Sequence, residues 1–202
     1  MSSDIDKIKS EYGKALLIGE HIPQNTDSAV KLLEKAVKLK NSNAKRFLAI
    51  EYISGEHLEQ DIEKGIALLT ECADSGDVIA SYRLGKIYLQ GEIMSQNLDK
   101  AEKYLLLAAD NEYTQYALAK LYLQEEKYDI QKAVNYFENC ADKNHLASYQ
   151  LGRIYLFGAA GLTKDKGQAI EWFTKSANDG NECAQAMPVS YTHLTLPTIL
   201  RV

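Results

Sequence analysis

The sequence predicts an all-α protein, an α/α solenoid of about five helix-turn-helix repeats that stack into a curved superhelix. One apolar segment begins at positions 12, 48, 84, 118 and 151, so its copies follow at steps of 36, 36, 34 and 33 residues. A second segment follows each copy and begins at positions 28, 64, 100, 132 and 168. No proline lies between positions 24 and 187, which favours uninterrupted helices across the array.

The first segment of each repeat has the spacing of one helix face. In the third copy, Leu84, Ile87, Tyr88 and Gly91 fall at i, i+3, i+4 and i+7, the period of an amphipathic helix. Small residues follow the start of each copy, at Gly13, Ala49, Gly85, Ala119 and Gly152. Since packed helix axes lie about 8–10 Å apart, these small residues predict the point where two helices cross.

The second segment is also predicted to be a helix, because Ala101, Tyr104, Leu105 and Ala108 have the same spacing. Its crossing points are expected at small residues near its end, namely Val37, Ala73, Ala109, Ala141 and Ala177. Three carboxylates are expected just before a second helix, where they would stabilise the positive end of its dipole: Asp27, Asp61 and Asp99. Glycine near positions 76 and 180 is typical of a helix C-terminus.

A single hairpin cannot bury its apolar faces, so stability must come from stacking neighbouring repeats. We therefore expect one repeat domain, residues 1–187, with a sixth repeat that is cut off after it has begun. Its five complete repeats are placed at residues 8–43, 44–79, 80–113, 114–146 and 147–183.

Two repeats carry the motif A-x-x-x-L-G-x-x-Y-x-x-G, at Ala80-Leu84-Gly85-Tyr88-Gly91 and at Ala147-Leu151-Gly152-Tyr155-Gly158. Together with the second-helix pattern that ends in Ser176-Ala177, this framework resembles the Sel-one-like repeat family. A period near 36 favours that family over tetratricopeptide repeats, which keep close to 34 residues. The resemblance covers residues 8–187 and implies a scaffolding or adaptor role, with arrays sometimes attached to larger proteins.

The repeat pattern of the sequence stops after Met187. We interpret residues 188–202 as a non-native tail, because the codons permitted from Val189 to Thr198 can be read as a transposon-end sequencing adapter. On this interpretation the chain is a fragment of a longer gene product.

Composition excludes some classes of function. The chain has 23 basic and 28 acidic residues and a net charge of −5, so nucleic-acid binding is not expected. The N-terminus lacks the apolar core of a signal peptide, and no apolar run approaches the roughly 18 residues of a membrane span. These features favour a cytoplasmic protein.

Catalytic and metal-binding signatures are not found, so we expect no enzyme activity, cofactor or metal. His21 and His57 occupy equivalent loop positions and are expected to face solvent. Cys72 and Cys140 align with alanine or serine in the other repeats, which predicts a packing role. The odd count of three cysteines favours a reducing compartment.

The first helices predict a binding surface on one stripe, at spacing i, i+4 and i+8. The nine residues of this stripe are Tyr82, Lys86, Gln90, Tyr116, Lys120, Gln124, Tyr149, Arg153 and Phe157. Lys14 and Arg46 would extend its basic character toward the N-terminus, although Ile50 interrupts it. Aromatic and cationic rows suit an extended acidic peptide. The alternative is that the tyrosines only fill space between helices and the lysines are only solvated.

The sequence therefore predicts a non-catalytic scaffold that binds a protein or peptide partner, plausibly an acidic one, through its concave face. No small-molecule substrate is expected. Two alternatives stay open. The array could be an accessory module of a larger enzyme, mobilisation protein or envelope protein, or it could be a hydrolase in its own right.

Overall fold

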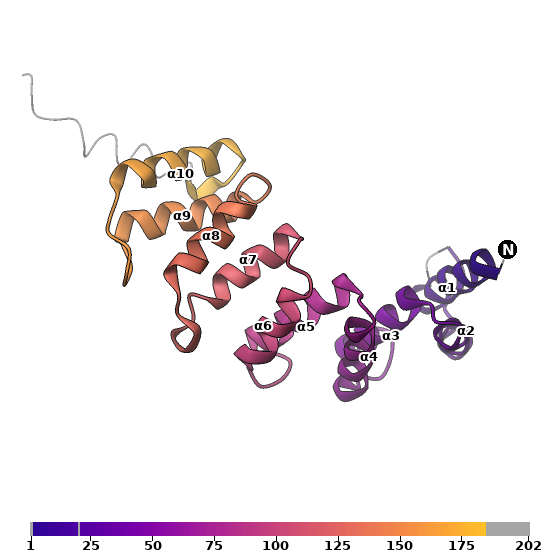
Figure 1. The fold of residues 1–202 in the computed structure, drawn as a ribbon. Coiled ribbons are helices and arrows are strands. Elements are labelled where there is room, and N and C mark those ends of the chain that lie inside the picture. The colour runs from indigo at the N-terminus through magenta and orange to yellow at the C-terminus, as the bar shows by residue number, and fades with distance from the viewer. Residues whose placement is uncertain (1, 20, 185–202) are drawn as a thin grey trace, which may run out of the picture. The chain divides into compact units, whose positions relative to one another are not determined.

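The computed structural model describes residues 2–19 and 21–184, with side chains described from Lys7 onward. In this part of the chain every named element is a helix, and consecutive helices form antiparallel pairs (Figure 1). The predicted all-α class and its helix pairs are confirmed. The proposed adapter-derived tail, residues 188–202, lies outside the described residues, as does the sixth repeat beyond Ala184.

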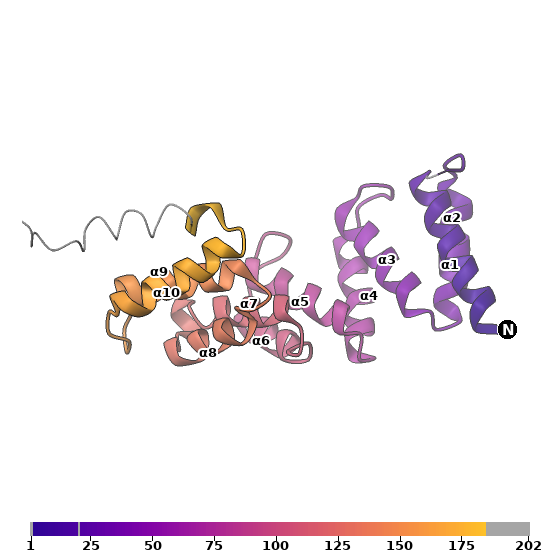
Figure 2. The ribbon, with the colours of Figure 1, turned by 90° about the horizontal axis from the view of Figure 1, so that it is seen from above.

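The chain divides into two compact bodies, Met1–Ala108 and the residues from Ala109 onward. The N-terminal body holds repeats 1 to 3, whose paired helices lie side by side in Figure 2, with the bounds α1 Ser2–Ile18, α2 Thr26–Lys38, α3 Ser42–Ser54, α4 Ile62–Asp74, α5 Val78–Gln90 and α6 Leu98–Leu106. The C-terminal body holds repeats 4 and 5, with α7 Glu112–Leu121, the 3-10 turn η1 Glu125–Lys127, α8 Ile130–Cys140, α9 His145–Phe157 and α10 Lys166–Asn178.

Each second helix begins at a side-chain cap. An Asn or Asp oxygen accepts the backbone N–H three residues ahead at 2.9–3.0 Å, at Asn25, Asp61, Asn97, Asp129 and Asp165. Asp61 therefore plays its predicted role. The placement of Asp27 and Asp99 before a helix was wrong, because Asn25 and Asn97 hold those caps and the two carboxylates lie inside the first turn. They still meet the positive end of the helix dipole there.

One backbone hydrogen bond closes the loop in every repeat. The capping residue donates its N–H to a carbonyl near the end of the first helix, and the five pairs are Asn25 to Leu16, Asp61 to Tyr52, Asn97 to Tyr88, Asp129 to Tyr122 and Asp165 to Tyr155, at 2.8–2.9 Å. The bond fixes where the second helix starts, whatever the length of the loop. The repeat step varies both in these loops and after the second helix, because the step from repeat 3 to repeat 4 is shortened where α6 ends early, at Leu106.

The first helices cross their partners at the predicted small residues. A Cβ atom on Gly152 would lie 2.7 Å from the ring of Phe173, and one on Gly85 would lie 2.5 Å from Leu105 Cγ. In the second helices the predicted position is buried in repeats 2 and 4, at Ala73 and Ala141, but Val37, Ala109 and Ala177 are partly exposed. The position that is buried in all five repeats lies one residue earlier, at Ala36, Cys72, Ala108, Cys140 and Ser176.

Candidate partner-binding surface

The stripe residues come from three first helices. In α5 and α9 the spacing i, i+4 and i+8 holds, which puts Lys86 and Arg153 at the centre of each set. In repeat 4 it does not hold to its end, because α7 ends at Leu121 and Gln124 lies beyond the helix. The three central cations are exposed in all three repeats, and Phe157 is 61% exposed at the end of α9.

Two of the stripe tyrosines, Tyr116 and Tyr149, pack inside their own repeats. The ring of Tyr116 meets Phe137 edge-on at a centroid distance of 5.5 Å, and Tyr149 packs against Phe173 at 5.6 Å. Burial raises the pKa of Tyr116 above its ordinary value. These contacts favour the space-filling interpretation for Tyr116 and Tyr149, so the cations are the stronger candidates for contact with a ligand.

The three central cations are unpaired within the part of the chain whose side chains the structure describes. Among residues 2–19 and 21–184, no carboxylate or hydrogen-bond acceptor pairs with the side chains of Lys86, Lys120 or Arg153. Some cations elsewhere are occupied. Three lysines of repeats 2, 3 and 4 that follow the helix caps lie 4.0–5.1 Å from a tyrosine ring, namely Lys64 over Tyr52, Lys100 over Tyr88 and Lys132 over Tyr122.

The two cations that would extend the basic stripe toward the N-terminus, Lys14 and Arg46, both form ion pairs within the protein. Arg46 forms a mostly buried ion pair with Asp77, the cap of α5 in the next repeat, and a second bond to Asn43. Lys14 pairs with Glu11 at 2.9 Å. Neither cation is therefore available to a ligand in the way that Lys86 is.

A groove lies between α3 and α5, and we call it the α3–α5 groove. It has a volume of about 650 Å³. Three stripe residues line it together with eight that the stripe prediction missed; the eleven are Ile50, Ile53, Ser54, Leu69, Ile79, Tyr82, Arg83, Lys86, Ile87, Gln90 and Ile93. The sequence did contain one indication of this groove, because Ile50, which interrupts the basic residues of the stripe, forms part of its apolar wall.

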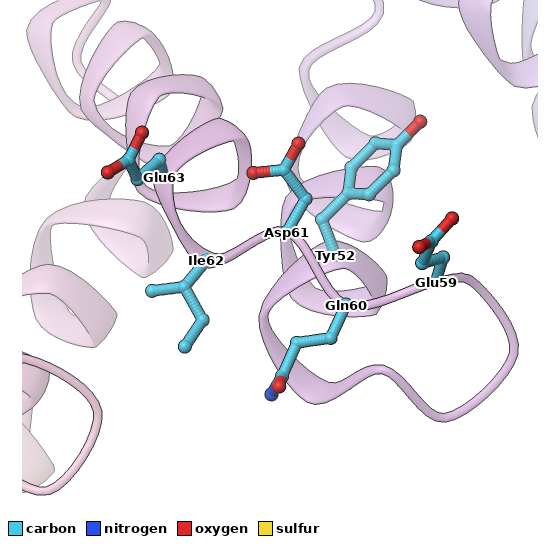
Figure 3. A pocket seen from close by; sticks show the side chains of 6 residues that line it. All are labelled: Tyr52, Glu59, Gln60, Asp61, Ile62 and Glu63. Atoms are coloured by element: carbon cyan, nitrogen blue, oxygen red, sulfur yellow. The ribbon is translucent and has the colours of Figure 1, made fainter.

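A second hollow, of about 550 Å³, lies at the loop between α3 and α4 (Figure 3), and its lining is Tyr52, Glu59, Gln60, Asp61, Ile62 and Glu63. Its polar groups already satisfy one another in part. Asp61 Oδ1 accepts the N–H of Lys64, and Lys64 Nζ donates to the Tyr52 hydroxyl at 2.7 Å. Its three carboxylates make it the wrong surface for an acidic ligand.

His57, Cys72 and Cys140 are held inside the protein, whereas His21 is exposed, as expected. His57 does not face solvent as expected, because its Nδ1 lies 2.9 Å from Oε2 of the buried Glu51. Cys72 and Cys140 are buried, which confirms their packing role, and burial raises the pKa of the Cys140 thiol to about 11. In the described part of the chain, no three His, Cys, Asp or Glu side chains are arranged to hold a metal ion.

Comparison with known families decides the identity of the repeat. The Sel1 repeat model matches five times, at residues 10–41, 42–77, 78–113, 112–145 and 145–181. The chain belongs to the Sel1 repeat family. No curated protein matches this Sel1 repeat chain. No described helix is both long and apolar enough to cross a membrane.

Solved structures share the fold. A protective antigen of uropathogenic Escherichia coli strains is 24% identical with a TM-score of 0.79, and the match covers 94% of this chain but 42% of the antigen. A Sel1 repeat protein from Oxalobacter formigenes is 23% identical with a TM-score of 0.71, covering 89% and 75% of the two chains. A sel1 repeat protein from Klebsiella pneumoniae is 16% identical with a TM-score of 0.52, covering 93% of each. The Sel1 repeat chain thus spans less than half the length of the E. coli antigen.

Proposed function

We propose that this Sel1 repeat protein is a non-catalytic scaffold that binds an acidic segment of a protein partner through the stripe. The observation that carries the proposal is the set of central cations Lys86, Lys120 and Arg153, which recur at one position of the first helices and are exposed, with no partner among the side chains that the structure describes. Within the C-terminal body, Lys120 and Arg153 occupy the same position of adjacent repeats, and side chains at repeat spacing suit an extended ligand.

The expected strength of these contacts is modest. Exposed ion pairs contribute about 0.2–1 kcal/mol each, so the loss of three costs roughly 0.6–3 kcal/mol, or about 3-fold to 150-fold in affinity. Binding that depends on them also weakens as salt rises, because exposed charges are screened beyond about 8–10 Å.

The test is a charge reversal with a matched control. A partner recovered by affinity capture is titrated by calorimetry against the parent protein and against the variant Lys86→Glu, Lys120→Glu, Arg153→Glu. The control reverses three exposed lysines of second helices and therefore changes the net charge equally: Lys31, Lys38 and Lys166. The stripe variant is expected to bind at least threefold more weakly than the control. Equal affinities of the two variants would overturn the proposal.

A second candidate function is that the array serves as an accessory module of a larger protein. The observation in its favour is that the chain spans 42% of the E. coli antigen. Sequencing the complete gene distinguishes this candidate, because an adjoining catalytic or envelope domain would be visible at once.

A further inference from the structure

The α3–α5 groove is apolar where the corresponding surface one repeat earlier is polar. Subtracting the repeat step of 36 residues from four of its lining positions gives polar residues each time. The groove has isoleucine at all four positions, and the pairs are Lys14 and Ile50, Asn43 and Ile79, Glu51 and Ile87, and His57 and Ile93. At these four positions the same backbone framework therefore carries polar side chains in one repeat and aliphatic ones in the next, whereas the positions of Ile53 and Leu69 are apolar in both, with Leu17 and Leu33 one repeat earlier.

The polar side chains of the earlier repeat have partners within the protein, whereas two of the groove isoleucines are exposed to solvent. Glu51 and His57 bond to each other, but Ile79 and Ile93 are 49% and 39% exposed at the groove. Isolated exposed apolar side chains are ordinary, but several gathered in a groove with a polar rim mark a binding site. The groove volume of about 650 Å³ is within the usual range for sites that enclose a ligand.

Charge defines what the groove accepts. Arg83 and Lys86, three residues apart on α5, both line it, and neither side chain pairs with an acceptor among the described residues. No acidic residue lines the groove, although the chain as a whole has a net charge of −5. The complementary ligand has an aliphatic group and a carboxylate close beside it.

We propose that the α3–α5 groove is the anchor pocket of the scaffold. It takes a leucine-sized aliphatic side chain from an internal segment of the partner protein, and an Asp or Glu next to that side chain pairs with Arg83 and Lys86. This inference rests on the proposed function and adds to it the chemistry of the ligand.

Isoleucine methyl groups report on the pocket directly, because five isoleucines line it. Protein labelled at isoleucine methyls is titrated by NMR with the blocked peptide Ac-Gly-Ser-Leu-Asp-Glu-Gly-Ser-amide. Saturable shifts are expected at the groove isoleucines and not at Ile130 or Ile154. Peptides with Ala for Leu, or Lys for both acids, are expected to bind about tenfold more weakly or worse, as the loss of a buried side chain or a charge contact requires.

Two variants test the pocket without disturbing the stripe test. Ile79→Trp fills the mouth, and Val78→Trp is its matched control, since the two neighbours are 49% and 47% exposed and only Ile79 lines the groove. Arg83→Glu removes one rim cation, with Lys31→Glu as its control. Only Ile79→Trp and Arg83→Glu are expected to weaken binding of the peptide.

The outcomes separate the two proposals. Three results would overturn the anchor-pocket proposal. The methyl signals of the groove isoleucines do not shift, Val78→Trp weakens peptide binding as much as Ile79→Trp, or dodecanoate saturates the groove where the peptide does not. A partner that still loses affinity on reversal of the three stripe cations would leave the proposed function standing. A partner indifferent to that reversal overturns the proposed function whatever the methyl spectra show.

Discussion

Replacing Gly85 by alanine is expected to destabilise repeat 3, although alanine is the better helix former. Gly85 is buried where α5 crosses α6. An added Cβ would lie 2.5 Å from Leu105 Cγ, 2.7 Å from Leu105 Cδ2 and 3.1 Å from the Leu105 backbone nitrogen. The side-chain atoms can rotate away, but the nitrogen moves only if α6 moves with it.

Two opposing effects set the magnitude. Alanine in place of glycine inside a helix gains about 0.8–1 kcal/mol in propensity. Forcing a methyl group into a closely packed site costs about 1–3 kcal/mol, and the upper part of that range applies here because a backbone atom is involved. The net effect is a loss of about 1–2 kcal/mol in the free energy of unfolding.

Urea unfolding followed by circular dichroism at the helix band measures this loss. Combining Gly85→Ala with Leu105→Ala, which opens the space, is expected to cost at least about 1 kcal/mol less than the sum of the single changes. The reverse substitution at the equivalent position of repeat 4, Ala119→Gly, serves as control and is expected to destabilise by about 1–2 kcal/mol, through helix propensity and the loss of one buried methyl group. A Gly85→Ala protein as stable as the parent, or strict additivity with Leu105→Ala, would refute the packing argument.

Three further predictions follow from buried polar groups. His57→Ala leaves the Glu51 carboxylate buried without its partner and is expected to lower the free energy of unfolding by about 1–3 kcal/mol. Ile at both positions, as in repeat 3, is expected to restore stability in urea unfolding. A His57→Ala protein as stable as the parent would contradict this. Thr114 is fully buried and its Oγ1 lacks a partner among the described residues. Thr114→Ala should therefore stabilise by up to about 1 kcal/mol, seen as a higher melting temperature, and a lower one would disprove it. A thiol reagent should modify the exposed Cys183 in the native protein and reach the buried Cys140, whose pKa is about 11, only after unfolding. Rapid modification of a second cysteine in the native protein would contradict this prediction.

The helix pairs were predictable because the repeat step and the crossing glycines are local features of the sequence. The early end of α7 was not. In repeat 4 the capping residue Asp129 bonds back to Tyr122, seven residues earlier, whereas repeats 2 and 3 have nine residues for the same closure. With a shorter loop to reach the same carbonyl, the last turn of the first helix opens. Glu125 also stands where those repeats end in a glycine of positive φ, at Gly55 and Gly91.

The candidate site was predictable only in part, because its chemistry depends on contacts between repeats. The spacing identifies Lys86 as a surface residue, but it cannot show that Arg46, on the preceding first helix, is held by Asp77 at a distance of 31 residues along the chain. Likewise, the tyrosines of α7 and α9 share a position with Tyr82, and only the packing against Phe137 and Phe173 shows what that position does.

The same comparison explains how one repeat framework carries a selective surface. Four repeats place a lysine or arginine at the centre of the first helix, and repeat 2 alone places Ile50 there. That residue lies against α5, so the cation of repeat 3, Lys86, borders an aliphatic wall in the α3–α5 groove. A uniform row of cations would attract any acidic chain and select by charge alone. An aliphatic wall beside a cation adds a requirement for shape, which charge cannot supply. The departure from the repeat pattern is therefore where selectivity between acidic partners is expected to arise.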